Sequence, residues 1–216
     1  MSRVVIAGGH GTIAQHLQRL LVEAGHEAVG IIRNPDHVAD LVEIGSSPVV
    51  LDLESISADQ LAIELRGADA VVFAAGAGPN STAERKLTVD RDGAILLADA
   101  AELAGVPRYV LVSAMSADDF DPDSDDIFQV YLRAKAEADA NVRARGIDWT
   151  IVRPGGLTND PGTGLVEAAE TLSRGSIPRE DVAAVLLSLI ETGAASQTQF
   201  SLIGGTTPIP EALAAL

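Results

Sequence analysis

The chain has 216 residues, of which 47 % are hydrophobic and 3 % aromatic, and it has no cysteine. This length fits one domain over residues 1–216, and the lack of cysteine excludes disulfides and thiolate chemistry. Lys and Arg number 15 against 31 Asp and Glu, and the resulting net charge of −16 argues against nucleic acid and anionic membranes as partners. Since no stretch resembles a targeting segment or a membrane span, we expect a cytoplasmic protein, either a monomer or a homodimer.

Short apolar runs alternate with helical patterns along the chain. Strands are predicted at residues 3–8, 27–33, 48–53, 70–75, 109–113 and 149–153, and helices at 12–25, 35–44, 58–66, 94–104 and 128–145. Strands that are apolar throughout need cover on both faces. We therefore predict an α/β fold of the Rossmann type, a doubly wound parallel sheet in a three-layer α/β/α arrangement.

The final third is less regular. Residues 154–164 are rich in Gly and Pro, a short strand is predicted at 165–171, a helix at 180–191 and a last strand at 199–203. The segment 155–178 is the candidate for a short C-terminal substrate lid.

A glycine-rich turn follows the first strand. Its sequence is Gly8-Gly9-His10-Gly11-Thr12-Ile13-Ala14, in which Gly8, Gly11 and Ala14 fit the pattern G-x-x-G-x-x-A. Residues without a Cβ let backbone N–H groups approach a pyrophosphate, and the following helix adds its N-terminal dipole. The turn predicts a dinucleotide site in which Gly8, His10, Gly11, Thr12 and Ile13 contact the cofactor. A purely structural turn is the alternative.

The second strand ends at Arg33 and Asn34. An NAD-selective site usually places Asp or Glu there, to accept hydrogen bonds from the ribose hydroxyls. Arg33 would instead pair with a 2′-phosphate. We therefore expect NADP, with NAD still possible and an ordinary surface arginine as the alternative reading.

The next two strands end in residues that can line the same cofactor. In a doubly wound sheet the ligand lies across the carboxyl ends of the strands. Asp52 could accept from the adenine amino group while Leu53 packs on the ring, although Asp52 could equally cap a helix. The small residues Ala74, Ala75 and Gly76 would let the chain pass close to the cofactor.

Tyr131 and Lys135 are four residues apart in the predicted helix at 128–145, and so share a face. A nearby ammonium lowers the pKa of a phenol, which can then exchange a proton with a carbonyl or an alcohol. The lysine can also hold the nicotinamide ribose. Ser113, at the end of the fifth strand, would polarise the same oxygen. A half-buried tyrosine beside a solvated lysine is the alternative.

The order of these motifs resembles the short-chain dehydrogenase/reductase superfamily, in particular its atypical, epimerase-like branch of small NAD(P)H-binding proteins. The most specific stretches are WTIVRPGGL at 149–157 and IPREDVA at 177–183. The resemblance implies that Ser113, Tyr131 and Lys135 form a catalytic triad and that Pro154 and Gly155 line the nicotinamide side. It also implies that Asp90 lies in the loop before the helix at 94–104, near the cofactor.

Three functions remain open. We predict an NADP-dependent oxidoreductase, or an epimerase- or dehydratase-like enzyme, acting on a small carbonyl or alcohol. The alternatives are a non-catalytic regulator that senses NADPH and an NADPH-dependent flavin or quinone reductase. The acidic segment 118–126 departs from a calcium loop at its sixth and twelfth positions, so we expect a solvated flap and no metal.

Overall fold

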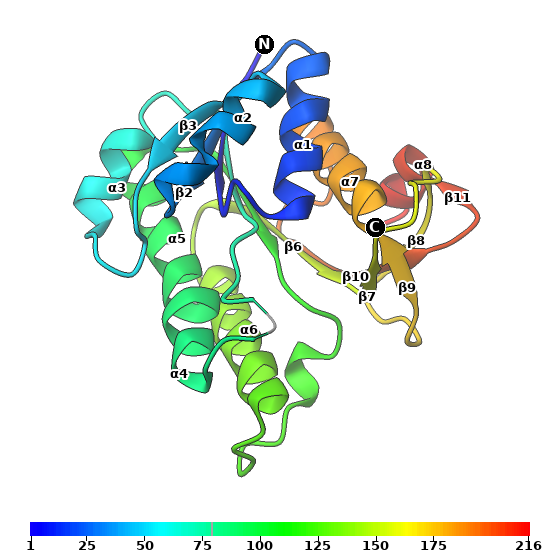
Figure 1. Cartoon of the computed structure of the whole chain (residues 1–216). Coiled ribbons are helices and arrows are strands. Elements are labelled where there is room, and N and C mark those ends of the chain that lie inside the picture. The colour runs from blue at the N-terminus through cyan, green and yellow to red at the C-terminus, as the bar shows by residue number, and fades with distance from the viewer. Residues whose placement is uncertain (79) are drawn as a thin grey trace.

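The computed structural model describes residues 1–78 and 80–216. Within these residues nine strands form one sheet in the order β11-β8-β10-β6-β5-β4-β1-β2-β3, and β7 and β9 pair separately. Helices cover both faces of the sheet (Figure 1). The three-layer Rossmann-type α/β prediction is confirmed.

The strands are shorter than predicted at several carboxyl ends. The third strand, for example, stops before Asp52 and Leu53. The bounds are β1 (Arg3–Ala7), β2 (Glu27–Ile32), β3 (Ser47–Val50), β4 (Ala70–Phe73), β5 (Arg108–Val112), β6 (Asp148–Pro154), β7 (Gly156–Thr158), β8 (Leu165–Ala169), β9 (Ser176–Pro178), β10 (Thr198–Gly204) and β11 (Thr207–Pro208).

The predicted helices are present, with additional short ones between them. Ser57 caps the third α-helix, with Gln60 completing a capping box. The bounds are α1 (Thr12–Glu23), η1 (Pro35–His37), α2 (Val38–Ile44), α3 (Ala58–Glu64), α4 (Ala83–Arg85), the π-helix η2 (Lys86–Asp92), α5 (Gly93–Ala104), η3 (Ala117–Asp119), α6 (Ile127–Arg143), α7 (Arg179–Thr192) and α8 (Ile209–Ala214).

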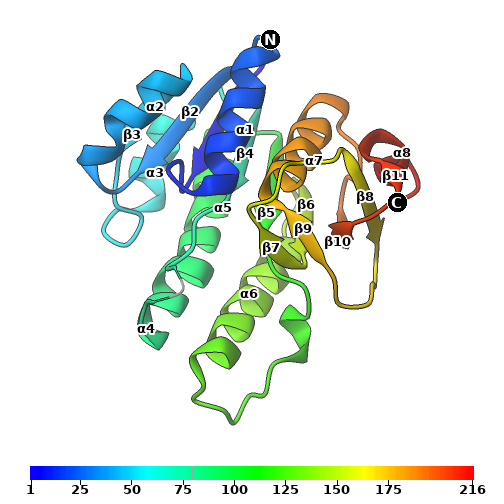
Figure 2. The same cartoon turned by 45° about the vertical axis from the view of Figure 1, so that its right-hand side comes forward.

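The central strand β1 shows how the sheet separates two apolar cores. Val4 and Ile6 pack in the core with α1 and α7, whereas Val5 and Ala7 pack in the core with α3, α5 and α6. Successive side chains of a strand point to opposite faces, so an apolar strand supplies both cores. Figure 2 shows α1 and α7 side by side over one face.

The C-terminal third differs from the prediction of a parallel sheet. β10 is parallel to β6, but β8 is antiparallel to both β10 and β11, so the sheet is mixed at this edge. Within the segment 155–178, β8 belongs to the main sheet and β7 pairs with β9, and the role of this segment as a substrate lid stays a prediction.

The segment before α5 also departs from the expectation. Asp90 was placed in a loop, but it lies in η2, which runs directly into α5, and it is 1 % exposed. π-helical turns accommodate an extra residue and are frequent at functional sites. Here the turn carries Lys86, Val89 and Asp90 inward.

No helix among the described residues is both long enough and apolar enough to cross a membrane.

Candidate functional site

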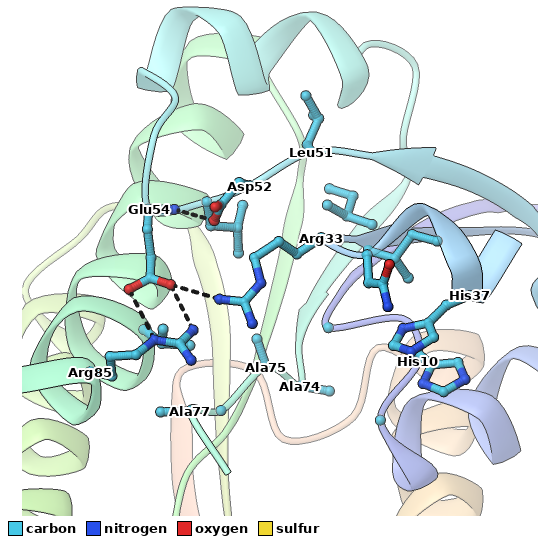
Figure 3. Close-up of a pocket in the computed structure, with 18 residues that line it drawn as sticks. His10, Arg33, His37, Leu51, Asp52, Glu54, Ala74, Ala75, Ala77 and Arg85 are labelled. Atoms are coloured by element: carbon cyan, nitrogen blue, oxygen red, sulfur yellow. Dashed lines mark hydrogen bonds and ion pairs between the residues drawn. The ribbon is translucent and has the colours of Figure 1, made fainter. Parts of the chain in front are cut away.

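A cleft of about 310 Å³ lies at the carboxyl ends of β1, β2, β3 and β4 (Figure 3). Its volume is in the range of small-molecule sites. The sequence-predicted residues that line it are Gly8, His10, Gly11, Arg33, Asn34, Asp52, Leu53, Ala74, Ala75 and Gly76. The fold therefore gathers most of the predicted cofactor residues into one cavity.

The two glycines of the turn have different tasks. Gly8 has φ +85°, and a Cβ there would lie 2.5 Å from the Ala75 Cα, so no other residue fits without moving the backbone. Gly11 is exposed and has φ −63°, which any residue adopts. A Cβ on Gly11 would be 3.2 Å from the Gly8 carbonyl oxygen, and longer branches would enter the cleft. Gly8 is thus needed for the fold, and Gly11 keeps the cleft open.

The N-terminus of α1 is suited to a phosphate group. The N–H groups of Thr12 and Ile13 belong to the first turn, so they lack the carbonyl partner that later residues have. Among the described residues, no side chain caps this helix end, and the first turn of α1 contains no Asp or Glu. The helix dipole adds positive potential. Thr12 and Ile13 do not line the cleft with side chains, so their contribution would come from the backbone.

His10 joins the turn to the next segment. Its ring stacks on His37 with a centroid separation of 3.5 Å, and its Nε2 lies 2.7 Å from Asp40 Oδ2. Both imidazoles line the cleft (Figure 3). Sequence reasoning missed His37, which is distant in the chain but brought beside the turn by η1.

At the far end of the cleft, Asn34 and Asp52 shape the backbone. The Asn34 side chain accepts a hydrogen bond from the Asp36 N–H and so caps η1. Asp52 Oδ1 accepts from the Glu54 N–H at 3.0 Å. Asp52 therefore stabilises a turn after β3, and the helix-cap reading is wrong because Ser57 holds that position.

Arg33 does not lie free on the surface. Its Nη1 is 3.1 Å from Glu54 Oε2, and Arg85 Nη2 is 2.7 Å from the same oxygen. Thr88 Oγ1 donates to the other Glu54 oxygen at 2.6 Å. The hydrogen bond from Arg85 lowers the pKa of Glu54, so this side chain is a carboxylate at neutral pH. No local pattern in the sequence predicts this cluster.

The small residues Gly76 and Ala77, which follow β4, lie against the buried carboxylate of Asp90. A Cβ on Gly76 would lie 3.1 Å from Asp90 Oδ1, so only glycine leaves that carboxylate in place. Asp90 Oδ2 accepts from the Ala77 N–H at 3.0 Å. The chain after β4 is thereby held against η2 by Asp90.

Lys135 lies beneath this segment and is 4 % exposed. Its Nζ is 3.4 Å from Asp90 Oδ1 and donates to the Val112 carbonyl at 3.2 Å. Lys135 Nζ also lies 5.8 Å from the centroid of the Tyr131 ring, and Lys86 Nζ lies 5.2 Å from the same centroid. Burial pulls the pKa of Lys135 down, but Tyr131 and Asp90 outweigh it, and the net shift is upward. Lys135 is a cation.

The shift of the Tyr131 pKa differs in direction from the sequence-based expectation. Burial raises it, and the opposing field of Lys135 is smaller because Asp90 neutralises part of that charge. Tyr131 is therefore a phenol, the proton-donating form, at neutral pH.

Ser113 has a buried partner that the sequence did not reveal. Its Oγ donates to Asp139 Oδ2 at 2.8 Å, and Arg153 Nε donates to the same oxygen at 2.8 Å. Arg153 also forms a two-pronged hydrogen bond with Asp118. Burial raises the pKa of Asp139, opposed by Arg153. Two features of the sequence could have indicated this contact. Asp139 follows Lys135 by four residues in the same helix, and Arg153 is a charged residue in an otherwise apolar strand.

Pro154 is the last residue of β6 and Gly155 follows it, and neither residue lines the cleft. The Pro154 carbonyl accepts from the Met115 N–H at 3.0 Å, and the Gly155 N–H donates to the Leu202 carbonyl at 2.9 Å. A Cβ on Gly155 would lie 2.4 Å from the Gly175 carbonyl oxygen. These contacts explain the glycine by packing, and its place beside a nicotinamide stays a prediction.

The acidic segment is partly built into the fold. Asp118 binds Arg153, and Asp126 caps α6 by accepting from the N–H groups of Phe128 and Gln129. Both ends of the segment are thus anchored while Asp118 and Asp126 stay exposed, and its role as an active-site flap stays a prediction.

Comparison with known proteins adds four findings. Residues 8–192 match the sequence profile of a family described as NAD(P)H-binding. An uncharacterized sugar epimerase of Bacillus subtilis, YhfK, is 37 % identical over 212 residues, covering 98 % of each chain. A solved structure described as a candidate NAD-dependent epimerase/dehydratase of Bacillus halodurans covers all of both chains, with 34 % identity and a TM-score of 0.90. The oxidoreductase ylbE of Lactococcus lactis is 28 % identical with a TM-score of 0.85, covering 99 % of this chain and 96 % of its own.

Proposed function

The chain belongs to the NAD(P)H-binding family, within the epimerase-like branch of the short-chain dehydrogenases/reductases, and we propose that it is an NADP(H)-preferring enzyme acting on a small carbonyl or alcohol. The observation that carries this proposal is the cleft itself. One end is the glycine turn with the uncapped α1, and the other end presents Arg33. Phosphate-binding and ribose-recognising groups thus lie along a single cavity.

The residues present fit a dinucleotide. Gly11 lines the cleft without a side chain, so a pyrophosphate could approach the N–H groups of Thr12 and Ile13 there. Asp52 and Leu53 would hold the adenine, and Arg33 the 2′-phosphate. Toward the other end of the cleft, the small residues Ala74 to Gly76 would let the cofactor come close to the backbone. Lys135 would hold the nicotinamide ribose.

When bound, the nicotinamide ring supplies or accepts a hydride. This chain's task is to move the accompanying proton. Tyr131 would donate its hydroxyl proton to the carbonyl oxygen of the substrate during reduction, and accept a proton from the alcohol in the reverse direction. Its raised pKa keeps that proton in place before reaction. Lys135 stabilises the phenolate that is left.

Ser113 would position the same oxygen. Its Oγ–H donates to Asp139, so polarising a carbonyl oxygen would need this proton to turn from Asp139 to the substrate. Arg153 fixes Asp139 from the other side, which keeps Ser113 in one rotamer.

The experiment is calorimetric titration with NADPH and NADH, followed by a turnover screen with NADPH against carbonyls, quinones, flavins and nucleotide sugars. Nucleotide sugars are included because the relative YhfK is described as a sugar epimerase. We expect tighter binding of NADPH and turnover with one carbonyl or alcohol class. Equal affinities would contradict the NADP preference.

One observation favours a second candidate, a regulator that binds NADPH without catalysis. Lys135 is already paired with Asp90, and Ser113 with Asp139. Under that function the pairs only stabilise the fold, and Tyr131→Phe would leave any turnover unchanged.

A further inference from the structure

Two arginines meet on one carboxylate oxygen at the edge of the cleft. Arg33 directly follows β2, whereas Arg85 ends α4, yet Nη1 of the first and Nη2 of the second lie 3.1 and 2.7 Å from Glu54 Oε2 (Figure 3). All three side chains line the cleft. The fold therefore holds two guanidinium groups within reach of a single anion.

Two cations and two carboxylates meet in this cluster. Two guanidinium groups face one carboxylate, and the Asp52 carboxylate lies nearby on the same rim. Glu54 is ionised, because its hydrogen bond with Arg85 lowers its pKa. Glu54 is thus an anion already seated between two cations, in the cavity where the proposed cofactor would bring another.

A phosphate group can take the place of this carboxylate. Both present oxygen pairs that match the guanidinium fork, but a phosphomonoester carries more charge and three acceptor oxygens. The side chain of Arg33 is 54 % exposed and that of Arg85 is 35 % exposed. Ion pairs so open to solvent contribute little to stability, so giving them up costs little.

We propose that Arg85 is a second binding residue for the 2′-phosphate of NADP(H), and that Glu54 is the anion this phosphate displaces from the two arginines. The proposal rests on the proposed function and deepens it. Discrimination between NADP and NAD is then set by three residues from three segments. Arg33 alone, the residue the sequence pointed to, accounts for only part of it.

The probe is adenosine 2′,5′-bisphosphate, with 5′-AMP as the ligand that lacks only the 2′-phosphate. Calorimetry on the whole chain measures the Kd of each of these two nucleotides. Arg85→Gln should weaken binding of the bisphosphate about tenfold, the effect of one lost charge-assisted hydrogen bond, and leave 5′-AMP unchanged. Glu54→Gln should tighten the bisphosphate severalfold, since the competing anion is gone.

Arg91→Gln is the matched control. Arg91 lies in η2, pairs with Asp92 and Glu137, and is 30 % exposed. Its loss removes a similar surface charge without touching the cleft lining. Both affinities should equal those of the unmodified chain.

Three results would overturn the proposal. The first is an Arg85→Gln variant that binds the bisphosphate as the unmodified chain does. The second is equal weakening of both nucleotides, which would make Arg85 a support for adenosine. The third is weaker bisphosphate binding by Glu54→Gln, which would make Glu54 a scaffold. If the unmodified chain prefers NADPH in each case, the proposed function stands. If it binds neither NADPH nor NADH, the proposed function itself fails.

Discussion

The Lys135 ammonium group lies 3.4 Å from Asp90 Oδ1, and both side chains are less than 5 % exposed. This ion pair joins α6 to η2 directly under the segment that follows β4. Lys135 therefore stabilises the fold, in addition to the catalytic role that its spacing from Tyr131 predicts.

Breaking this pair should destabilise the protein. Lys135→Met leaves the Asp90 carboxylate buried without its cation, and such a loss costs about 3–5 kcal/mol in the free energy of unfolding. Adding Asp90→Asn should restore part of the loss, because no charge is then left unpaired. Chemical denaturation of the two single variants and the double variant measures the coupling; strictly additive losses would show that the pair does not interact.

Tyr131→Phe tests the proton donor. We expect kcat to fall about 10²–10⁴-fold, the usual contribution of a general acid, with little change in the Kd of NADPH. The control is Tyr109→Phe, which removes the other tyrosine hydroxyl of the chain. That hydroxyl is buried and donates to the Ala94 carbonyl at 2.8 Å, so its loss should lower stability and spare kcat. An unchanged kcat in Tyr131→Phe would leave the regulator as the supported function.

Gly11→Val tests the phosphate turn. The backbone of Gly11 is already in a conformation that valine adopts, and its Cβ would press on the Gly8 carbonyl oxygen at 3.2 Å, so the protein should still fold with a modest loss in the free energy of unfolding. The branches would fill the space of the pyrophosphate, and NADPH binding should be lost in calorimetry. Gly146→Val, where a Cβ would meet nothing within 4 Å, is the control and should bind normally. Normal binding by Gly11→Val would reduce the turn to a structural one.

The Asp118–Arg153 contact should make stability depend on pH. The hydrogen bond from Arg153 lowers the pKa of Asp118 below its unfolded value of about 3.9. Its stabilisation is therefore fully present above the unfolded pKa and disappears as the pH falls through the lower folded value. Asp118→Asn should be less stable than the unmodified chain at pH 6, and the difference should shrink as the pH falls below the unfolded pKa and toward the lower folded value. A difference that does not change as the pH falls would refute an ionic origin.

The sequence by itself determined the sheet and the phosphate turn. Apolar runs such as residues 70–73 must be covered on both faces, and Gly8 must take a positive φ, so both features follow from local pattern. The helical spacing of Tyr131 and Lys135 likewise follows from one element. The antiparallel edge made by β8 and β11 does not, because it depends on pairing between distant segments that are short and only partly apolar.

Only the tertiary structure decided which charges meet. Glu54 pairs with Arg33 and Arg85, Lys135 with Asp90, and Asp139 with Ser113 and Arg153, across separations of 14 to 45 residues. Electrostatic contacts act through space, and a charged residue carries no periodicity that names its partner. The local sequence therefore placed the catalytic and cofactor candidates on their elements, while the fold set their partners and with them the protonation states on which the proposed chemistry depends.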